Sequence, residues 1–257
     1  MIADFEERFK AAVQAFWTGR TEQQERQRQR GRADRGARGA VTGGNHIGPL
    51  EDLVKDVLID CGIPENSIFK NRKLELPGYY RSEKQWDLIV VANNKLHIAI
   101  EFKSQVGPSF GNNFNNRTEE AIGNAVDLRR AVQERTLGDT VNPPFLGYFF
   151  ILEDCDEVHS SLCLEEPHFQ VDEVFAANPA ALRRKFGRML RAGVGYAKRY
   201  ELLLERVLLE NLYNAACLTL ATKSNPTTIT FPNANLQVRQ FIGRLEGFAT
   251  GIAEAGL

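Results

Sequence analysis

The segment QWDLIVVANNKLHIAIEFKSQ, residues 85–105, constrains the fold most, because its apolar residues restrict how its two halves can pair. Asn93 and Asn94 interrupt two runs rich in β-branched residues, which is typical of a β-hairpin. A three-residue loop, Asn93–Lys95, gives one wholly apolar face with the cross-strand pairs Ala92–Leu96, Val90–Ile98 and Leu88–Ile100. A two-residue turn would mix apolar and polar residues on each face, so the pattern favours the longer loop.

The predicted register gathers ionisable residues on the opposite face of the hairpin. Val91 then pairs with His97, Ile89 with Ala99, and Asp87 with Glu101. Lys103 lies two residues beyond Glu101 and therefore on the same side. Directly opposed side chains have Cβ atoms about 5 Å apart, so Asp87 and Glu101 are expected to be close enough to share one metal ion.

Two carboxylates beside an amine are suited to phosphodiester hydrolysis. Carboxylate oxygens can hold Mg²⁺ and leave positions open for water, which the metal then activates. A neighbouring lysine can orient or deprotonate the attacking water, because its pKa responds to its surroundings. The pattern of Asp, thirteen residues and Glu-x-Lys is short, and an exposed strand with a cross-strand charge pair explains it too.

The size and cysteine content of the chain restrict its class. Its 257 residues are 43% hydrophobic, which is enough for a sizeable core in one large domain. No run of about 18 apolar residues occurs, so no membrane span is expected. The four cysteines show no CxxC pair, which excludes a zinc ribbon and argues against a disulfide framework. We expect a cytoplasmic protein.

Charge is distributed unevenly along a chain whose net charge is only −1. Nine of the 33 acidic residues lie between Thr136 and Leu182, a segment without Lys or Arg. Basic residues therefore gather elsewhere, as a local DNA-facing surface requires. Taken alone, chance clustering on solvated faces explains this distribution better.

The N-terminal region, residues 1–45, is predicted to combine a helix with a basic arm. Residues 4–17 have apolar side chains at helical spacing, with Phe5, Phe9 and Phe16 on one face. Residues 18–44 are rich in Gln, Gly and Arg, with seven arginines against three acids, and are expected to be a mobile arm. Such an arm either contacts DNA phosphates or serves as a solvated linker.

Residues 46–257 are predicted to form an α/β core, a mixed β-sheet flanked by helices, with additional C-terminal helices. The expected strands are Ser67–Leu76, Trp86–Ala92, Leu96–Lys103 and Phe145–Leu152. The expected helices are Leu50–Cys61, Thr118–Glu134, a basic stretch from about Pro179, Glu201–Thr222 and Leu236–Ala255. A loop is expected over Gly107–Arg117.

Longer strings around the hairpin carry a family resemblance. PGYYRSEKQWDLIVV and AIEFKSQVGPSFGNNFNNRTEEAIGNAVDL resemble the XhoI-type family of type II restriction endonucleases, within the PD-(D/E)xK nuclease superfamily. Weaker similarity continues through FFILEDCDEVHSSLCLEEPHFQV, so the resemblance covers roughly residues 39–171. It implies a restriction-endonuclease-like core, and the region beyond about Pro179 is not placed by it.

The resemblance implies a specific activity. Asp87 and Glu101 would bind Mg²⁺, for which Mn²⁺ is expected to substitute, and Lys103 would be the catalytic lysine. The superfamily often has Pro before the aspartate, where this chain has Trp86. The family cleaves double-stranded DNA at the palindrome CTCGAG and leaves 5′ overhangs. A palindrome implies a homodimer, and a host methyltransferase without a stable complex is expected.

Other acids, histidines and cysteines are weaker candidates. Glu75 or Glu83 could replace or assist Asp87. Many relatives also use an acid on a helix near the site, and here the candidates Glu51, Asp52 and Asp56 match no family string. Spacing assigns no zinc to the group formed by Cys155, His159, Cys163 and His168.

Two segments are candidates for DNA contact. The predicted loop 107–117 supplies amide groups that can read adenine and an arginine that can read guanine, just after the site strand: Asn112, Asn113, Asn115, Asn116 and Arg117. The alternative is that Asn and Gly only make turns there. The basic stretch after Pro179 supplies candidate phosphate contacts, or else a solvated helix face: Arg183, Arg184, Lys185 and Arg188.

The sequence is compatible with three functions. The first is a site-specific endonuclease, which the intact triad and the long Asn-rich string favour. The second is a repair nuclease or resolvase of the same fold, which would use the triad without sequence specificity. The third is a DNA-binding protein with an inactive nuclease fold, in which the three residues only pack or pair.

Overall fold

The computed structural model describes residues 4–29, 47–138, 143–185 and 187–257. The helices are α1 (Phe5–Gln29), α3 (Gly48–Asp60), α4 (Phe110–Gln133), α5 (Asp156–His159), α6 (Tyr196–Leu209) and α7 (Val238–Glu254). The strands of the main sheet are β1 (Ile68–Lys70), β4 (Leu88–Ala92), β5 (Lys95–Gln105), β6 (Phe145–Glu153), β10 (Ala215–Ala221) and β11 (Ile229–Thr230). The remaining strands are β2 (Glu75–Pro77), β3 (Glu83–Gln85), β7 (Leu162–Leu164), β8 (Ala176–Lys185) and β9 (Arg188–Gly193).

A mixed six-stranded sheet in the order β1-β4-β5-β6-β10-β11 forms the centre of the fold. The pairs β1–β4, β4–β5 and β10–β11 are antiparallel, while β5–β6 and β6–β10 are parallel. Parallel neighbours need a crossover, and α4 supplies the one between β5 and β6. Every residue of β6 and of β10 is buried, as expected for central strands covered on both faces.

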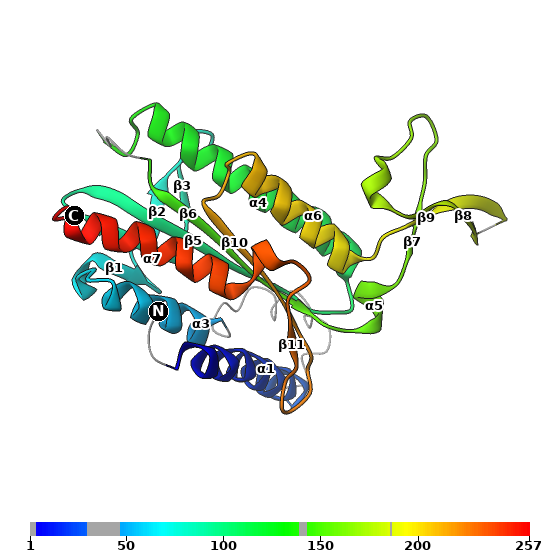
Figure 1. The fold of residues 1–257 in the computed structure, drawn as a ribbon, viewed down its shortest axis with the longest axis horizontal. Helices are drawn as coiled ribbons and strands as arrows, with labels where there is room; N and C mark the ends of the chain where they lie inside the picture. Colours follow the sequence, from blue (N-terminus) through cyan, green and yellow to red (C-terminus); the bar gives the residue numbers. More distant parts are fainter. Residues whose placement is uncertain (1–3, 30–46, 139–142, 186) are drawn as a thin grey trace.

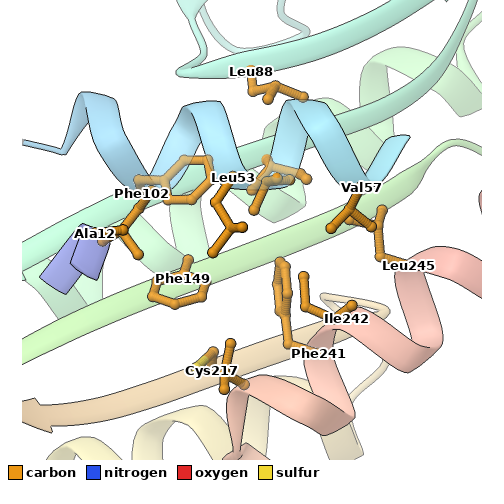
Figure 2. Packing of buried hydrophobic residues seen from close by; sticks show 14 of the residues in the cluster. Ala12, Leu53, Val57, Leu88, Phe102, Phe149, Cys217, Phe241, Ile242 and Leu245 are labelled. Atoms are coloured by element: carbon orange, nitrogen blue, oxygen red, sulfur yellow. The ribbon is translucent and has the colours of Figure 1, made fainter. Parts of the chain in front are cut away.

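Helices cover both faces of this sheet (Figure 1). On one face α1, α3 and α7 pack on a cluster that includes Leu88, Phe149 and Phe241, several of whose side chains are seen from close by in Figure 2. On the other face α4 and α6 cover a second cluster, which includes Trp86 and Phe150. The predicted mixed sheet with flanking helices is therefore confirmed, including α6 and α7 near the C-terminus.

The hairpin has the predicted register next to the site residues, but its turn differs from the prediction. Leu88 pairs with Ile100, Ile89 with Ala99 and Val90 with Ile98, as expected. Beyond these, Val91 pairs with Leu96 and Ala92 with Lys95, so the turn has two residues rather than three. Both turn residues, Asn93 and Asn94, have φ above +50°, as a type I′ turn requires. His97 is an extra residue, and this β-bulge restores the register that the apolar residues favour.

Four expected elements in the first half of the chain differ in the structure. The strand expected over Ser67–Leu76 is divided into β1 and β2, because Asn71 and Lys73 between them have positive φ. Helix α1 continues to Gln29, so residues 18–29 are helical rather than a mobile arm, and residues 30–46 lie outside the described part. The loop expected at 107–117 is mostly helix, because α4 begins at Phe110. Thr118 is not a helix cap; its hydroxyl donates to the carbonyl of Phe114 inside α4.

The C-terminal half contains more strand than expected. The basic stretch after Pro179 is not helical; it forms β8 and β9, which pair antiparallel in a small three-stranded sheet ordered β7-β9-β8. The helix expected over 201–222 ends at Leu209, and residues 215–221 form β10. The apolar run Ala215–Ala221 has no decisive period, and periodicity alone does not distinguish a buried strand from a buried helix segment.

The last helix, α7, lies within its predicted bounds. No helix in the described residues is both long enough and apolar enough to cross a membrane.

Candidate active site

The three predicted site residues lie together where β4 and β5 run side by side. Asp87 directly precedes β4, and Glu101 and Lys103 lie in β5. Because Leu88 is paired with Ile100, the same register sets Asp87 opposite Glu101. This convergence follows from the apolar pattern of the hairpin, as the sequence predicted.

The two carboxylates and the lysine are joined by short contacts. Lys103 Nζ lies 3.5 Å from Oδ2 of Asp87 and also contacts Oε1 of Glu101. The backbone N–H of Phe102 donates to Oδ2 of Asp87 at 2.7 Å, which fixes that carboxylate against β5. The side chain of Glu101 is only 3% exposed, whereas that of Asp87 is 31% exposed, so the site opens to solvent on the Asp87 side.

A second lysine, which the sequence did not single out, belongs to the site. Lys84 in β3 donates to Oε2 of Glu101 at 2.7 Å. Its ammonium group also lies 4.6 Å from the centre of the buried Trp86 ring. Each oxygen of Glu101 therefore contacts a different lysine. Lys84 and Trp86 fall on one side of the strand, and the exposed Glu83 and Gln85 fall on the other. This alternation was the signal in the sequence that could have identified Lys84 as an inward-facing lysine.

The electrostatics of the site separate its two carboxylates. Burial raises the pKa of Asp87 above its usual range, and the negative charge of Glu101 raises it further. Burial also raises the pKa of Glu101, but Lys103 and Lys84 outweigh this effect and lower it below its usual range. Burial lowers the pKa of Lys103, but Glu101 and Asp87 outweigh it and raise that pKa. Glu101 and Lys103 are thus a charged pair, while Asp87 lacks a full counter-charge.

A third acid faces this group from α3. Glu51 is buried, and its pKa is raised to about 7, first by burial and then by the negative charge of Asp87. Lys70, whose Nζ lies 3.7 Å from Oε2 of Glu51, offsets this rise only in part. Of the three helix acids considered from the sequence, Glu51 is the one on the apolar stripe, in step with Val54 and Leu58. An acid on the apolar stripe of a helix was the signal in the sequence that could have identified Glu51 as a buried carboxylate.

The remaining acid candidates are exposed. Asp52 pairs with Lys70, and Asp56 with Arg8, on the outer side of α3. Glu75 accepts a hydrogen bond from the backbone N–H of Leu74, and Glu83 lies on the outward side of β3. No group of three or more His, Cys, Asp or Glu side chains in the described residues is arranged to hold a metal ion.

The predicted DNA-reading residues lie on the first turns of α4. Asn112, Asn115 and Asn116 are exposed, and their i, i+3, i+4 spacing sets them on one helix face. Asn113 is half-buried. Arg117 is mostly buried and paired with Glu120, and its Nε has no hydrogen-bond partner among the described residues.

The predicted phosphate contacts lie on the antiparallel pair β8–β9, which we call the ribbon. Arg184 and Arg188 are exposed near its tip, while Arg183 donates to the backbone carbonyl of Ser161. Lys185 is the last residue of β8, and its side chain is outside the described part. In Figure 1 the ribbon projects away from the main sheet, beyond α5.

The base of the ribbon is held beside the start of α4. Tyr196, which follows β9 at the start of α6, stacks on Phe110 with 6.1 Å between ring centres. A Cβ on Gly111 would lie 2.8 Å from the hydroxyl of Tyr196, so Gly is required for this close approach. The ribbon and the Asn-bearing face of α4 therefore start from the same corner of the molecule, beyond the end of β5.

Comparison with known proteins agrees with this geometry. Residues 26–233 match the family described as Restriction endonuclease XhoI. The chain belongs to the XhoI restriction endonuclease family. The match reaches well beyond residues 39–171, to which the sequence strings pointed, and includes the ribbon, α6 and β10.

Characterised relatives support the same assignment. The chain is 39% identical to the type II restriction enzyme BstVI of Geobacillus stearothermophilus over 195 residues, covering 74% of this chain and 80% of the relative. It is 37% identical to the type II restriction enzyme XhoI of Xanthomonas vasicola over 211 residues, covering 81% and 77%. It is 41% identical to the type II restriction enzyme AbrI of Azospirillum brasilense over 179 residues, covering 69% and 80%. No solved structure matches the chain.

The family membership fixes the general activity. The protein is a type II site-specific deoxyribonuclease with a restriction-endonuclease-like fold, and its substrate is DNA. Enzymes of this type generally need a divalent metal ion. Neither a repair nuclease nor an inactive DNA-binding protein has comparable support.

Proposed function

We propose that the enzyme uses Asp87, Glu101 and Lys103 to hydrolyse phosphodiester bonds in both strands of duplex DNA, with Mg²⁺ as its cofactor. One observation carries the proposal. The two carboxylates and the lysine converge from adjacent strands at a point where one carboxylate remains without a full counter-charge.

The residues present suit a hard divalent cation. The donors are carboxylate oxygens, which Mg²⁺ and Mn²⁺ prefer. The pKa of Asp87 is raised partly because Glu101 repels its charged form, and a cation between them would relieve that repulsion. Asp87 and Glu101 would hold the ion, and Glu51 is placed to add a third negative charge.

Each residue has a role that its surroundings support. When bound, Mg²⁺ would polarise the scissile phosphate and lower the pKa of water. Lys103, held by both carboxylates, would orient the attacking water and offset negative charge that develops on the phosphate. Phe102 keeps Asp87 in place through its backbone N–H, so that the carboxylate does not have to be ordered during the reaction.

The family resemblance extends the proposal to sequence specificity. The enzyme is proposed to act as a homodimer in the cytoplasm, to recognise the palindrome CTCGAG and to leave 5′ overhangs. A two-fold dimer suits a palindrome, because each protomer then meets the same half-site. A methyltransferase that modifies this site would protect the DNA of the host.

Two surfaces are proposed to contact the DNA. Asn112, Asn115 and Asn116 form an exposed amide face at the N-terminal end of α4, where the helix dipole also favours phosphate. The ribbon carries Arg184 and Arg188 at its tip, and a two-stranded antiparallel ribbon fits the major groove of B-DNA. Both surfaces begin beyond the end of β5, so a duplex at the site would lie within reach of each.

Digestion of matched plasmids tests the function directly. One plasmid carries a single CTCGAG site and the other a scrambled site of the same composition, CTGCAG. With Mg²⁺ or Mn²⁺ the first is expected to give one linear band whose sequenced ends have 5′ overhangs. EDTA is expected to stop cleavage, and Ca²⁺ to support binding without cleavage.

The alternatives give different results in the same experiment. A smear from both plasmids would indicate a nuclease without sequence specificity, and full cleavage in EDTA would overturn the metal assignment. Cleavage of both plasmids at discrete positions other than CTCGAG would overturn only the recognition sequence. Light scattering of the DNA-bound protein measures whether two protomers occupy one site.

A further inference from the structure

Lys84 reaches Glu101 through a tertiary contact. It lies in β3, which pairs with β2 in a separate two-stranded sheet, outside the six-stranded sheet that carries the other site residues. Strand alternation turns Lys84 inward, and its side chain is only 12% exposed. A lysine is rarely buried to this degree unless it is paired.

Two contacts hold the ammonium group of Lys84 in place. It donates to Oε2 of Glu101 at 2.7 Å, and it lies over the ring of Trp86 at 4.6 Å. Trp86 is itself almost fully buried, so the ring cannot move aside easily. Lys103 contacts the other oxygen of the same carboxylate. Glu101 is therefore held at both oxygens by two cations.

When all four are ionised, Asp87, Glu101, Lys84 and Lys103 carry no net charge between them, but both lysines contact Glu101. A divalent cation that binds Glu101 must approach two ammonium groups already in contact with that carboxylate. Charges about 4–5 Å apart interact by several times the thermal energy even at an effective dielectric constant of about 20. A phosphate of bound DNA adds negative charge and so favours entry of the cation.

We propose that Lys84 is a positioning residue that holds Glu101 through Oε2 and whose charge sets the concentration of divalent cation at which the site fills. The effect is to keep the metal site weak until DNA is present. This inference rests on the proposed function, because it takes Glu101 to be a metal ligand.

Calorimetric titration of Mn²⁺ into the DNA-free full chain tests the inference. Lys84→Gln is expected to bind Mn²⁺ roughly tenfold more tightly than the wild type, because it removes one repelling charge. Lys84→Arg keeps the positive charge, so its Mn²⁺ affinity is expected to stay closer to that of the wild type than the affinity of Lys84→Gln does. Lys198→Gln, which breaks an ion pair with Glu201 within α6, is the matched control and should not change the affinity for Mn²⁺.

Further variants separate the role of Lys84 from folding. Lys84→Met keeps an apolar chain on Trp86 and should bind Mn²⁺ as tightly as Lys84→Gln. In Trp17→Phe, Trp86 is the only tryptophan, so Mg²⁺ should change its fluorescence as the ammonium group above it shifts. This measurement leaves Lys84 unmutated and remains informative if a neutral variant does not fold.

The outcomes distinguish this inference from the proposed function. A wild type that binds no Mn²⁺, or a Glu101→Gln variant that binds it as tightly as the wild type, overturns the metal site and this inference with it. If both behave as expected, but folded Lys84→Gln binds Mn²⁺ no more tightly than the wild type, only the role of Lys84 is overturned. Unchanged Trp86 fluorescence at saturating Mg²⁺ likewise overturns it.

Discussion

The β4–β5 hairpin and the β8–β9 ribbon are both antiparallel strand pairs, yet they differ in almost every other respect. The middle of the hairpin is buried on both faces, and its single irregularity is the bulge at His97. Among its described side chains, the ribbon is exposed at residues 182–184 and 187–189, and its pairing shifts register twice, around Asn178. Burial thus fixes register in the hairpin, whereas few of the ribbon's apolar side chains, such as Leu190 and Ala192, are buried and able to fix it.

The same difference separates the charged groups of the two regions. In the hairpin, Glu101 is buried and Lys103 is half-buried, and each contacts a fixed partner, as the proposed chemistry requires. In the ribbon, Arg184 and Arg188 are exposed and can adapt to a partner surface. We therefore expect substitutions in the hairpin to affect chemistry or folding, and substitutions near the ribbon tip to affect only DNA binding.

The largest expected effect is on cleavage by the hairpin triad. Asp87→Ala, Glu101→Ala and Lys103→Ala should each lower the cleavage rate roughly 10²–10⁴-fold, because each removes a group proposed to act on the metal, water or phosphate. Gel shift on a CTCGAG duplex should show that DNA binding persists. A Lys103→Ala protein that cleaves at the wild-type rate would remove this lysine from the mechanism.

The next effect, on folding, contrasts the buried hairpin with the exposed ribbon. Ile100 is fully buried, and a Cβ on Gly147 would lie 3.2 Å from it, so there is little room for the site to relax. Ile100→Ala should therefore reduce the free energy of unfolding by about 2–5 kcal/mol. Leu182→Ala in the ribbon, at a side chain that is 58% exposed, should change it by less than about 0.5 kcal/mol. Urea denaturation of both variants checks the contrast, which similar decreases in stability would contradict.

A smaller effect concerns pH and Glu51. Its folded-state pKa of about 7 lies above the ordinary value, so ionising Glu51 costs stability progressively as pH rises from about 4.5 through 7. Glu51→Gln removes this cost and should stabilise the metal-free protein by about 1–3 kcal/mol at pH 8.5, but not at pH 4.5. Urea denaturation at both pH values measures the difference.

The neighbouring acid Asp52 provides the control for Glu51. Asp52 is 63% exposed, so Asp52→Asn should show no comparable gain at high pH. Equal effects of Glu51→Gln at both pH values would show that the substitution acts through packing rather than charge.

The smallest expected effect concerns the ribbon tip. Arg184→Ala with Arg188→Ala should weaken DNA binding about tenfold and reduce its salt dependence, by about 0.9 in the log–log slope for each phosphate that is no longer neutralised. The cleavage rate at saturating DNA and the melting temperature should not change. Arg239→Ala, an exposed arginine of α7 paired with Glu6, should leave the slope unchanged. If both proteins show the same slope, the ribbon does not bind phosphate.

Local sequence patterns predicted the structure correctly where the apolar residues that they place on one face are buried in the fold. The alternation of Leu88, Val90, Ile98 and Ile100 predicted both the hairpin register and the convergence of the site residues. The helices expected over Leu50–Cys61 and Leu236–Ala255 agree closely with α3 and α7. The patterns failed where a segment suits two structures, as at Ala215–Ala221, which is an apolar run without a decisive period.

The sequence by itself determined the hairpin, the triad on one of its faces and the family. Those features depend on contacts between residues close in the chain, whose spacing reveals how they pair. Only the tertiary structure brought Glu51 from α3 close to Asp87 and Lys84 from β3 to Glu101, and only it made the basic segment a ribbon. Such contacts join separate elements, and no local period encodes which distant side chains will share a buried site.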